Sequence, residues 1–195
     1  LTGAEIELVS ALGREYKLKS ALANFTASFD YIFVDAPPSL GLLTINALVA
    51  AQTIVIPLQC EYYALEGLGQ LLNTINLIKQ TLNPDLEIEG IVLTMANKRT
   101  NLTHEVISEA KKYFADKIYR TVIGRNVKLS EAPGFGKPIA LYDPLCIGTM
   151  QYQALATEFL NRNANDKLKN NENLEIQIQT TEAQKIGSTE KYIEN

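Results

Sequence analysis

Residues 31–40 read Tyr31-Ile-Phe-Val-Asp-Ala-Pro-Pro-Ser-Leu40, an apolar run followed by an acid, two prolines and a serine. The first four residues are all apolar and are aromatic or β-branched, a pattern typical of a short strand buried on both faces of a parallel sheet. The prolines end that strand, because proline cannot donate to a β-ladder. Asp35 is therefore expected at the carboxyl end of a strand, where open α/β sheets bind their ligands.

Two interpretations of Asp35 follow from this position. Its carboxylate can act on Mg²⁺, or on a metal-bound water, in a phosphate-binding site. It can instead be a turn or capping residue, the commoner role of an aspartate in this setting. Ser39 is expected to cap a helix that begins at about Leu40. Residues 31–40 taken alone leave both interpretations open.

The rest of the chain alternates between the periodicities of strands and helices. Apolar or alternating runs predict strands at 5–9, 31–34, 53–57, 87–96 and 118–123. Apolar residues spaced by three and four predict helices at 14–24, 39–52, 64–82, 101–116, 126–131 and 148–162, with a loop rich in glycine and proline at 134–144. Strands separated by helices imply βαβ units. The predicted fold is therefore α/β, with a doubly wound, mostly parallel sheet flanked by helices.

The composition fits one domain with a polar tail. The chain has 195 residues, 46% of them hydrophobic, which is enough to bury a sizeable core. Its two cysteines are too few for a disulfide framework and favour a reducing compartment. No apolar run approaches the roughly 20 residues of a membrane span. Polar residues dominate from Asn163 onward, so we expect a domain at 1–162 and a disordered tail at 163–195, in which 174–179 alternates like a stray edge strand.

Positive charge is concentrated in one region, although the net charge of the chain is -4. Residues 96–137 contain nine of the eighteen Lys and Arg residues and four acids. Lys98 and Arg99 follow one predicted strand, and Arg125 and Lys128 follow the next. Because successive strands of a parallel sheet end at one edge, these four charges can converge on the phosphates of a nucleotide or of a nucleic acid. The remaining lysines of this region fit a solvated helix face better.

Several kinds of site are excluded or disfavoured by the residues present. No GxxxxGK[ST] phosphate loop occurs, and Gly134-Phe-Gly-Lys137 is followed by proline where such a loop needs Ser or Thr. His104 is the single histidine, which excludes a multi-histidine metal site and disfavours a catalytic triad. Cys60 and Cys146 lack a CxxC arrangement and are expected to be buried. Glu61 is expected on a solvated rim or at a partner surface.

Five separated segments resemble the ParA/Soj family of chromosome- and plasmid-partitioning ATPases, and they occur in the family's order. The segment Asp35-Ala-Pro-Pro-Ser-Leu-Gly-Leu-Leu-Thr-Ile-Asn-Ala-Leu48 is similar to the family's Walker B motif and the helix after it. The other four are Pro57-Leu-Gln-Cys-Glu-Tyr-Tyr-Ala-Leu-Glu-Gly-Leu68, Arg99-Thr-Asn-Leu102, Arg125-Asn-Val-Lys-Leu-Ser-Glu-Ala-Pro133 and Gly136-Lys-Pro-Ile-Ala-Leu-Tyr-Asp-Pro144. The resemblance covers residues 1 to about 162.

The resemblance implies a P-loop NTPase fold of the deviant-Walker type, together with cofactors and partners. In the family, ATP and Mg²⁺ are held within a homodimer, the dimer binds DNA without sequence preference, and a ParB/Spo0J-like protein triggers hydrolysis. The family is of bacterial type, and its members are cytoplasmic and nucleoid-associated. We therefore expect these cofactors, these partners and this location for the intact protein, and no membrane association.

The resemblance also assigns roles to residues at a nucleotide site. Asp35 matches the Walker B acid, a catalytic residue that acts on Mg²⁺ indirectly, through its water. Arg125 and Asn126 fall in the loop on the adenine side. Asn97 lies where a contact with the base is expected.

Two more matches concern DNA. Arg99 and Lys128 correspond to basic positions that contact DNA in the family. Lys128 is usually Arg there, and the loss of a bidentate fork matters less for a phosphate contact than for base readout. Two alternatives stay open: a non-enzymatic module that binds DNA or a partner, and a MinD-like membrane ATPase. The second needs a basic amphipathic C-terminal helix, and residues 163–195 lack one.

The chain also departs from the family pattern. The family's deviant P-loop and its switch I acids lie upstream of the Walker B acid, and the residues before Asp35 match the segment after switch I. We therefore expect an N-terminally truncated, C-terminal portion that alone neither binds ATP tightly nor hydrolyses it. Gly124 replaces the usual proline before Arg125, which is expected to loosen the adenine loop. Leu145-Cys-Ile147 replaces a usually basic, polar stretch.

Overall fold

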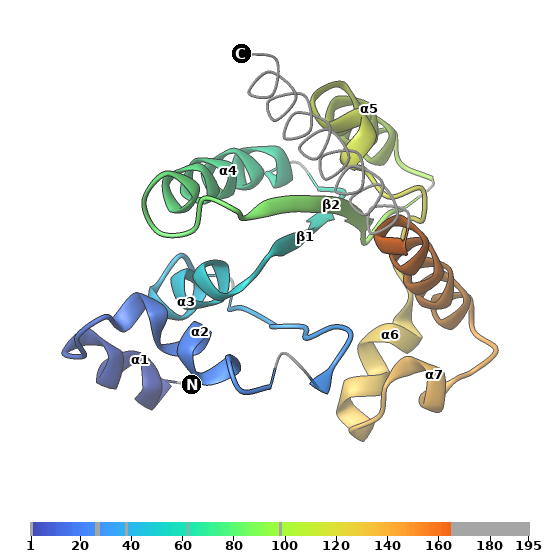
Figure 1. The fold of residues 1–195 in the computed structure, drawn as a ribbon. Helices are drawn as coiled ribbons and strands as arrows, with labels where there is room; N and C mark the ends of the chain where they lie inside the picture. The colour runs from blue at the N-terminus through green and yellow to red at the C-terminus, as the bar shows by residue number, and fades with distance from the viewer. Residues whose placement is uncertain (1, 26–27, 38, 62, 98, 165–195) are drawn as a thin grey trace, which may run out of the picture.

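The computed structural model describes residues 2–25, 28–37, 39–61, 63–97 and 99–164 (Figure 1). Its first part contains α1 (Thr2–Val9), the 3₁₀ turn η1 (Arg14–Tyr16), α2 (Lys17–Leu22) and α3 (Leu42–Ala50). The central part contains β1 (Thr53–Gln59), α4 (Ala64–Thr81), β2 (Glu87–Thr94), α5 (Asn101–Phe114) and η3 (Ala115–Lys117). The last part contains α6 (Val127–Glu131), η4 (Ala132–Phe135), α7 (Ile139–Tyr142) and a final helix over 147–164.

The sheet is parallel throughout its described part. β1 pairs with β2 along its whole length, with one register shift after Ile54. Residues 118–124 extend the sheet beyond β2, through the parallel bridges Ile91–Ile118 and Ala96–Gly124. Each crossover contains a helix, α4 or α5, as the predicted βαβ units require.

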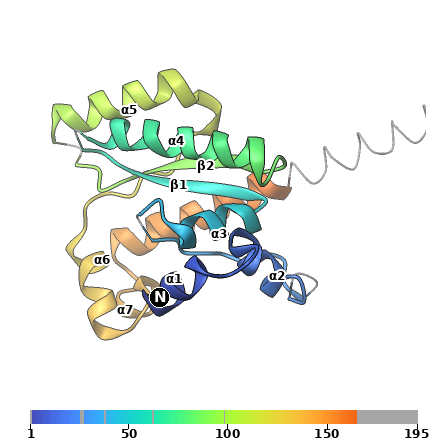
Figure 2. The ribbon, with the colours of Figure 1, turned by 90° about the vertical axis from the view of Figure 1, so that its left-hand side faces the viewer.

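Helices cover both faces of this sheet, which confirms the predicted doubly wound α/β fold. α4 and α5 lie on one face, and α3 and the final helix lie on the other (Figure 2). Ile91, Val92 and Leu93 of β2 are all buried, because the strand is covered from both sides. This explains why β2 is a continuous apolar run rather than an alternating one.

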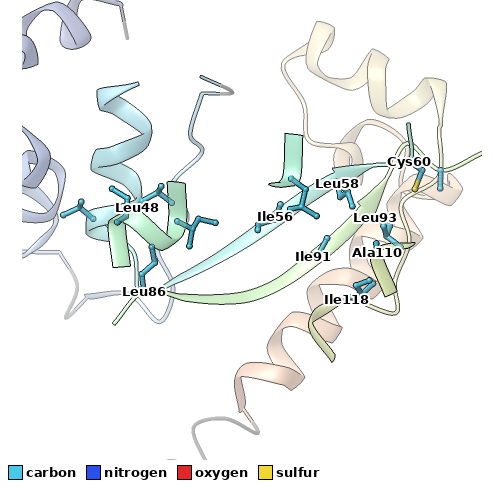
Figure 3. Close-up of a cluster of buried hydrophobic side chains, with 14 residues drawn as sticks. Leu48, Ile56, Leu58, Cys60, Leu86, Ile91, Leu93, Ala110 and Ile118 are labelled. Atoms are coloured by element: carbon cyan, nitrogen blue, oxygen red, sulfur yellow. The ribbon is translucent and has the colours of Figure 1, made fainter. Parts of the chain in front are cut away.

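The main hydrophobic core joins buried side chains of β1 and β2 to buried residues of α3, α4 and α5 (Figure 3). Ile56, Leu58 and Cys60 are buried in alternation at the end of β1, as the period of two in a strand requires. They pack in one cluster with buried residues spaced by three and seven along α4, namely Leu68, Ile75 and Ile78. A second cluster on the opposite face joins Val92, Tyr119 and Ile123 to Leu155 and Phe159 of the final helix.

The predicted strand at 31–34 is wrong. Residues 31–37 have no regular secondary structure, and Phe33 is 74% exposed rather than buried. A strand is stable only when a neighbour accepts and donates its backbone hydrogen bonds, and no described segment forms a β-ladder with this one. The aromatic side chains instead contact the final helix: the rings of Tyr31 and Phe33 lie 5.2 and 5.4 Å from the ring of Phe159.

The helix after this segment begins later than predicted. Gly41 rather than Ser39 is the N-cap residue of α3, and its position has no side-chain cap. The hydroxyl of Thr44 donates to the backbone carbonyl of Pro37, 3.2 Å away, and to that of Ser39. Thr44 thus ties the 31–40 segment to the first turn of α3.

The predicted strand at 5–9 is also wrong, because α1 is a helix from Thr2 to Val9. Acids and apolar residues alternate over residues 5–9, and this alternation has the period of two that is typical of a strand although the segment is helical. Glu and Leu are good helix formers, and the segment has no described strand beside it to pair with. The helices predicted at 14–24, 64–82, 101–116, 126–131 and 148–162 are confirmed in place, with shifted ends.

The predicted loop at 134–144 contains the end of η4 and all of α7. At the C-terminus, the final helix continues to residue 164, two residues past the predicted domain boundary. The rest of the predicted tail, including 174–179, lies outside the described residues. No helix in the described part of the chain is both long and apolar enough to cross a membrane.

Candidate functional site

Two adjoining hollows lie at the carboxyl edge of the sheet. The larger has a volume of about 810 Å³ and is lined by the end of β1, the start of α4 and residues between Met95 and Thr103. The smaller, of about 370 Å³, is lined by Ala96, Asn97, Arg99, Gly124, Arg125, Ile147 and Gln151. Asn97 and Arg125 line both hollows, so they mark the place where the two meet.

The hollows form where three parallel segments end side by side. The backbone N–H of Cys60, just after β1, donates to the carbonyl of Thr94 at 3.0 Å. Beyond β2, the N–H of Ala96 donates to the carbonyl of Ile123 at 3.2 Å, and Arg125 N–H donates to the carbonyl of Ala96 at 3.0 Å. These bonds fix the loops that carry Asn97 and Arg125 next to each other.

Arg125 is held across the larger hollow by an ion pair. Its Nη2 lies 3.0 Å from Oε1 of Glu61, which follows β1. Both side chains are more than half exposed. Such a pair typically contributes only about 0–1 kcal/mol. The guanidinium can therefore exchange this carboxylate for another acceptor at little cost.

Asn97 is fixed by its own loop. Its backbone N–H donates to Oγ1 of Thr103 at 3.2 Å, and its side-chain carbonyl accepts from the N–H of Arg99 at 3.1 Å. The hydroxyl of Thr100 donates to the carbonyl of Asn97 at 3.1 Å. Within the described part of the chain, the Nδ2 amide group of Asn97 has no hydrogen-bond partner, so it is available to a ligand.

The other residues predicted at the nucleotide site lie elsewhere. Asn126 lines neither hollow: its Oδ1 accepts from the N–H of Lys128 at 2.8 Å and caps α6. Asp35 is exposed, lines neither hollow, and makes no hydrogen bond or ion pair with another described residue. The geometry therefore brings together Asn97 and Arg125 but not Asn126 or Asp35.

The four predicted basic residues converge only in part. Arg99 shares the smaller hollow with Arg125, whereas Lys128 lines neither hollow and pairs with Glu131 at 2.9 Å. A hydrogen bond to Glu131 raises the pKa of Lys128, and its ammonium also lies 5.7 Å from the ring centre of Tyr142. Lys98 lies outside the described residues.

Gln151 is a supporting residue that no sequence signal identified. Its Oε1 accepts a hydrogen bond of 3.1 Å from the N–H of Gly124, just before Arg125. A proline at this position has no N–H and could not make this bond. The anchor from the final helix counters the loosening expected from Gly124. Nearby, Ile147 of the apolar replacement stretch is 62% exposed and lines the smaller hollow.

The described residues do not build a metal site by themselves. They contain no cluster of three or more His, Cys, Asp or Glu side chains that could hold a metal ion. His104 is exposed on α5, and Cys60 is buried as predicted, while Cys146 is only half-buried. Burial raises the pKa of the Cys60 thiol, which makes it a poor nucleophile.

Comparisons with known proteins give consistent matches. The AAA domain family model matches residues 1–88. The sporulation initiation inhibitor protein Soj of Bacillus subtilis is 62% identical over 158 residues, which cover 81% of this chain and 62% of the relative. The chromosome partitioning protein ParA of Myxococcus xanthus is 56% identical over 162 residues, covering 83% of this chain and 57% of the relative. The chain thus spans about three fifths of the length of these relatives.

One solved structure also matches the chain in sequence and fold. The chain resembles the crystal structure of cobyrinic acid a,c-diamide synthase from Mycobacterium smegmatis with bound ATP analog and magnesium. The TM-score is 0.59 at 40% sequence identity, and the match covers 65% of this chain and 52% of that one.

Proposed function

The chain belongs to the ParA/Soj family of chromosome-partitioning ATPases, and from this membership we propose that the carboxyl edge of its sheet binds the adenosine part of ATP. The observation that carries the proposal is that Asn97 and Arg125 line both hollows at that edge. Ligands of open α/β sheets bind in this position. The related structure that holds an ATP analog and magnesium supports the same class of ligand.

Each of the two residues has a chemical role in this proposal. The Nδ2 group of Asn97 donates a hydrogen bond to a ring nitrogen of the base. Arg125 leaves Glu61 and lays its planar guanidinium against the base or its sugar. Asn126 acts indirectly, because it caps the helix that follows Arg125.

The phosphate side of an ATP site is not built by these residues. The 195 residues contain no GxxxxGK[ST] loop. Among the residues that the structure describes, Asp35 belongs to no group of side chains that could hold Mg²⁺. Mg²⁺ is normally bound through one or two carboxylates together with the substrate phosphates. We propose that Asp35 supports no hydrolysis with these residues alone, and that this chain alone neither binds ATP tightly nor hydrolyses it. The Walker B role of Asp35 applies only where a phosphate loop completes the site.

Adenosine titration into the 195-residue chain tests the binding proposal. At about −0.3 kcal/mol per ligand atom, adenosine is expected to bind with a Kd on the order of 0.1 mM. Arg125→Ala and Asn97→Ala should each weaken binding by roughly 3- to 10-fold, the effect of removing one hydrogen bond. Isothermal titration calorimetry or amide chemical shifts measure both values.

Two control variants separate the site from the rest of the surface. Glu61→Gln breaks the ion pair but keeps Arg125, so it should retain affinity within about threefold. Lys111→Ala removes a charge from the exposed face of α5 and should change nothing. Unchanged binding in both Arg125→Ala and Asn97→Ala would contradict the proposal.

A second function, non-specific DNA binding, is favoured by the two arginines that share the smaller hollow. Arg99→Ala should weaken binding to all DNA sequences alike and reduce the slope of log K against log salt by about 0.9 for each phosphate that the protein no longer neutralises. Lys79→Ala is the matched control, because Lys79 pairs with Glu87 at the opposite edge of the sheet. Equal effects of both variants would contradict a role for Arg99. We propose Lys128, which lines neither hollow, as a separate DNA-contacting residue, because it matches a basic position that contacts DNA in the family.

In the whole protein we propose the remaining family properties. ATP and Mg²⁺ bind within a homodimer, a ParB/Spo0J-like protein stimulates hydrolysis, and the dimer acts on DNA in the cytoplasm, on the nucleoid. The alternative is a non-enzymatic module that keeps the DNA or partner contacts. The adenosine titration separates the two, because the alternative requires no base site.

A further inference from the structure

Met95 has an unusual backbone conformation. Its φ is +53°, and it is the one non-glycine residue with positive φ among those that the structure describes. Residues that carry a Cβ atom seldom adopt this conformation, because Cβ approaches the following carbonyl group. Such strained residues are concentrated at functional sites, where the surrounding structure holds them in place.

The hydrogen bonds on both sides of Met95 explain how the strain is held. Before it, the carbonyl of Thr94 accepts from the N–H of Cys60 and ends the pairing with β1. After it, Ala96 both donates to the carbonyl of Ile123 and accepts from the N–H of Arg125. At Met95, just after β2, the backbone stops pairing with β1 but continues to pair with residues 118–124.

A glycine could make the same turn at lower cost, since it adopts positive φ readily. Core packing of the Met95 side chain does not offset this strain, because Met95 belongs to neither hydrophobic cluster of the described residues. Instead it is 36% exposed and lines the larger hollow, together with Asn97 and Arg125. The strained turn therefore places Met95 in the wall of the hollow.

We propose that Met95 is a base-contacting residue, whose thioether supplies the apolar surface against which the flat face of the purine lies. Sulfur is polarisable and contacts aromatic rings favourably. Polar groups on Asn97 and Arg125 would fix the orientation of the base, and Met95 would supply the dispersion contact that they lack. This inference rests on the proposed adenosine site and adds a residue to it.

Three variants test this role in the 195-residue chain. Met95→Ala keeps Cβ and the strain but removes the thioether, so adenosine should bind about 2- to 10-fold more weakly. Met95→Gly removes both, so binding should weaken equally while the melting temperature rises above that of Met95→Ala. Met95→Leu keeps an apolar side chain of similar volume and should retain most of the affinity. Calorimetric titration and thermal unfolding measure these values.

Met150→Ala is the control, because Met150 is also exposed but lines neither hollow. It should leave the adenosine affinity unchanged. If the unmodified chain binds adenosine and Met95→Ala binds it equally well, the inference is overturned while the proposed site stands. If the unmodified chain binds no adenosine, the proposed site and this inference both fail.

Discussion

At the scale of single residues, Glu158 of the final helix holds residues 118–124, the segment that extends the sheet beyond β2, in place. Its carboxylate accepts hydrogen bonds from the N–H groups of Arg120 and Thr121 at 2.7 and 2.9 Å, and from Arg162 at 3.0 Å. Burial alone would raise the pKa of Glu158, but these hydrogen bonds favour the charged form and lower it. The segment fixed in this way leads directly into Arg125.

This geometry predicts a pH-dependent effect of Glu158→Gln. A carboxyl group whose pKa is lowered by folding stabilises the protein above its unfolded pKa of about 4.3, and the contribution disappears as the pH falls through the folded value. The substitution should therefore lower the free energy of unfolding by about 1–3 kcal/mol at pH 7 and by less at pH 3. Urea unfolding at both pH values measures the difference.

Glu109→Gln is the matched control, because Glu109 is a more exposed acid that pairs with Lys112 on the surface of α5. It should cause a smaller decrease in stability at pH 7. A decrease for Glu158→Gln that is equally large at both pH values would contradict the role of its charge.

Residues of the candidate site were predictable only where a general rule places them. Arg99 and Arg125 were expected together because parallel strands end at one edge of a sheet, whereas Asn97 was expected near the base only from the family resemblance. Glu61 and Gln151 were not, because their partners Arg125 and Gly124 are 64 and 27 residues away and no periodic pattern marks the pairs. The strained backbone of Met95 likewise has no sequence signal, since methionine is not a residue type that indicates positive φ.

At the scale of elements, the prediction succeeded where each element has its partners in the described chain. α4 and the final helix follow their apolar periodicity, and β1 and β2 follow their apolar runs. The segment 31–34 has the same strand-like composition, yet it remains irregular because no described segment forms a β-ladder with it. The local sequence pattern indicates which secondary structure a segment prefers, but a strand also needs a hydrogen-bonded neighbour.

The absence of a strand at 31–34 determines where Asp35 lies. Asp35 was expected at a strand end in the ligand crevice, but with 31–37 irregular it is exposed and away from both hollows. The neighbouring element is well formed: Asn46 in α3 accepts from the N–H of Leu18 at 3.0 Å and donates to the carbonyl of Arg14 at 2.8 Å. Hydrogen bonds therefore hold α3 in place, whereas none holds the Asp35 side chain to another described residue.

At the scale of the whole molecule, the described residues build the sheet edge that we propose as the base side of a nucleotide site. The sheet edge carries polar and apolar groups suited to a base, in two hollows that meet at Asn97 and Arg125. No described group is arranged to hold phosphates and Mg²⁺ together, and no phosphate loop occurs in the sequence. Affinity for a nucleotide should therefore come mainly from the nucleoside.

The ratio of the ATP and adenosine affinities of the 195-residue chain shows whether its residues bind the phosphates of ATP. Calorimetric titration with adenosine, and with ATP in the presence of Mg²⁺, should give Kd values within about threefold of each other, both on the order of 0.1 mM. A phosphate loop would contribute several charge-assisted hydrogen bonds and a metal ion. A micromolar Kd for ATP with Mg²⁺, roughly 100-fold below that for adenosine, would show that this chain does hold the phosphates.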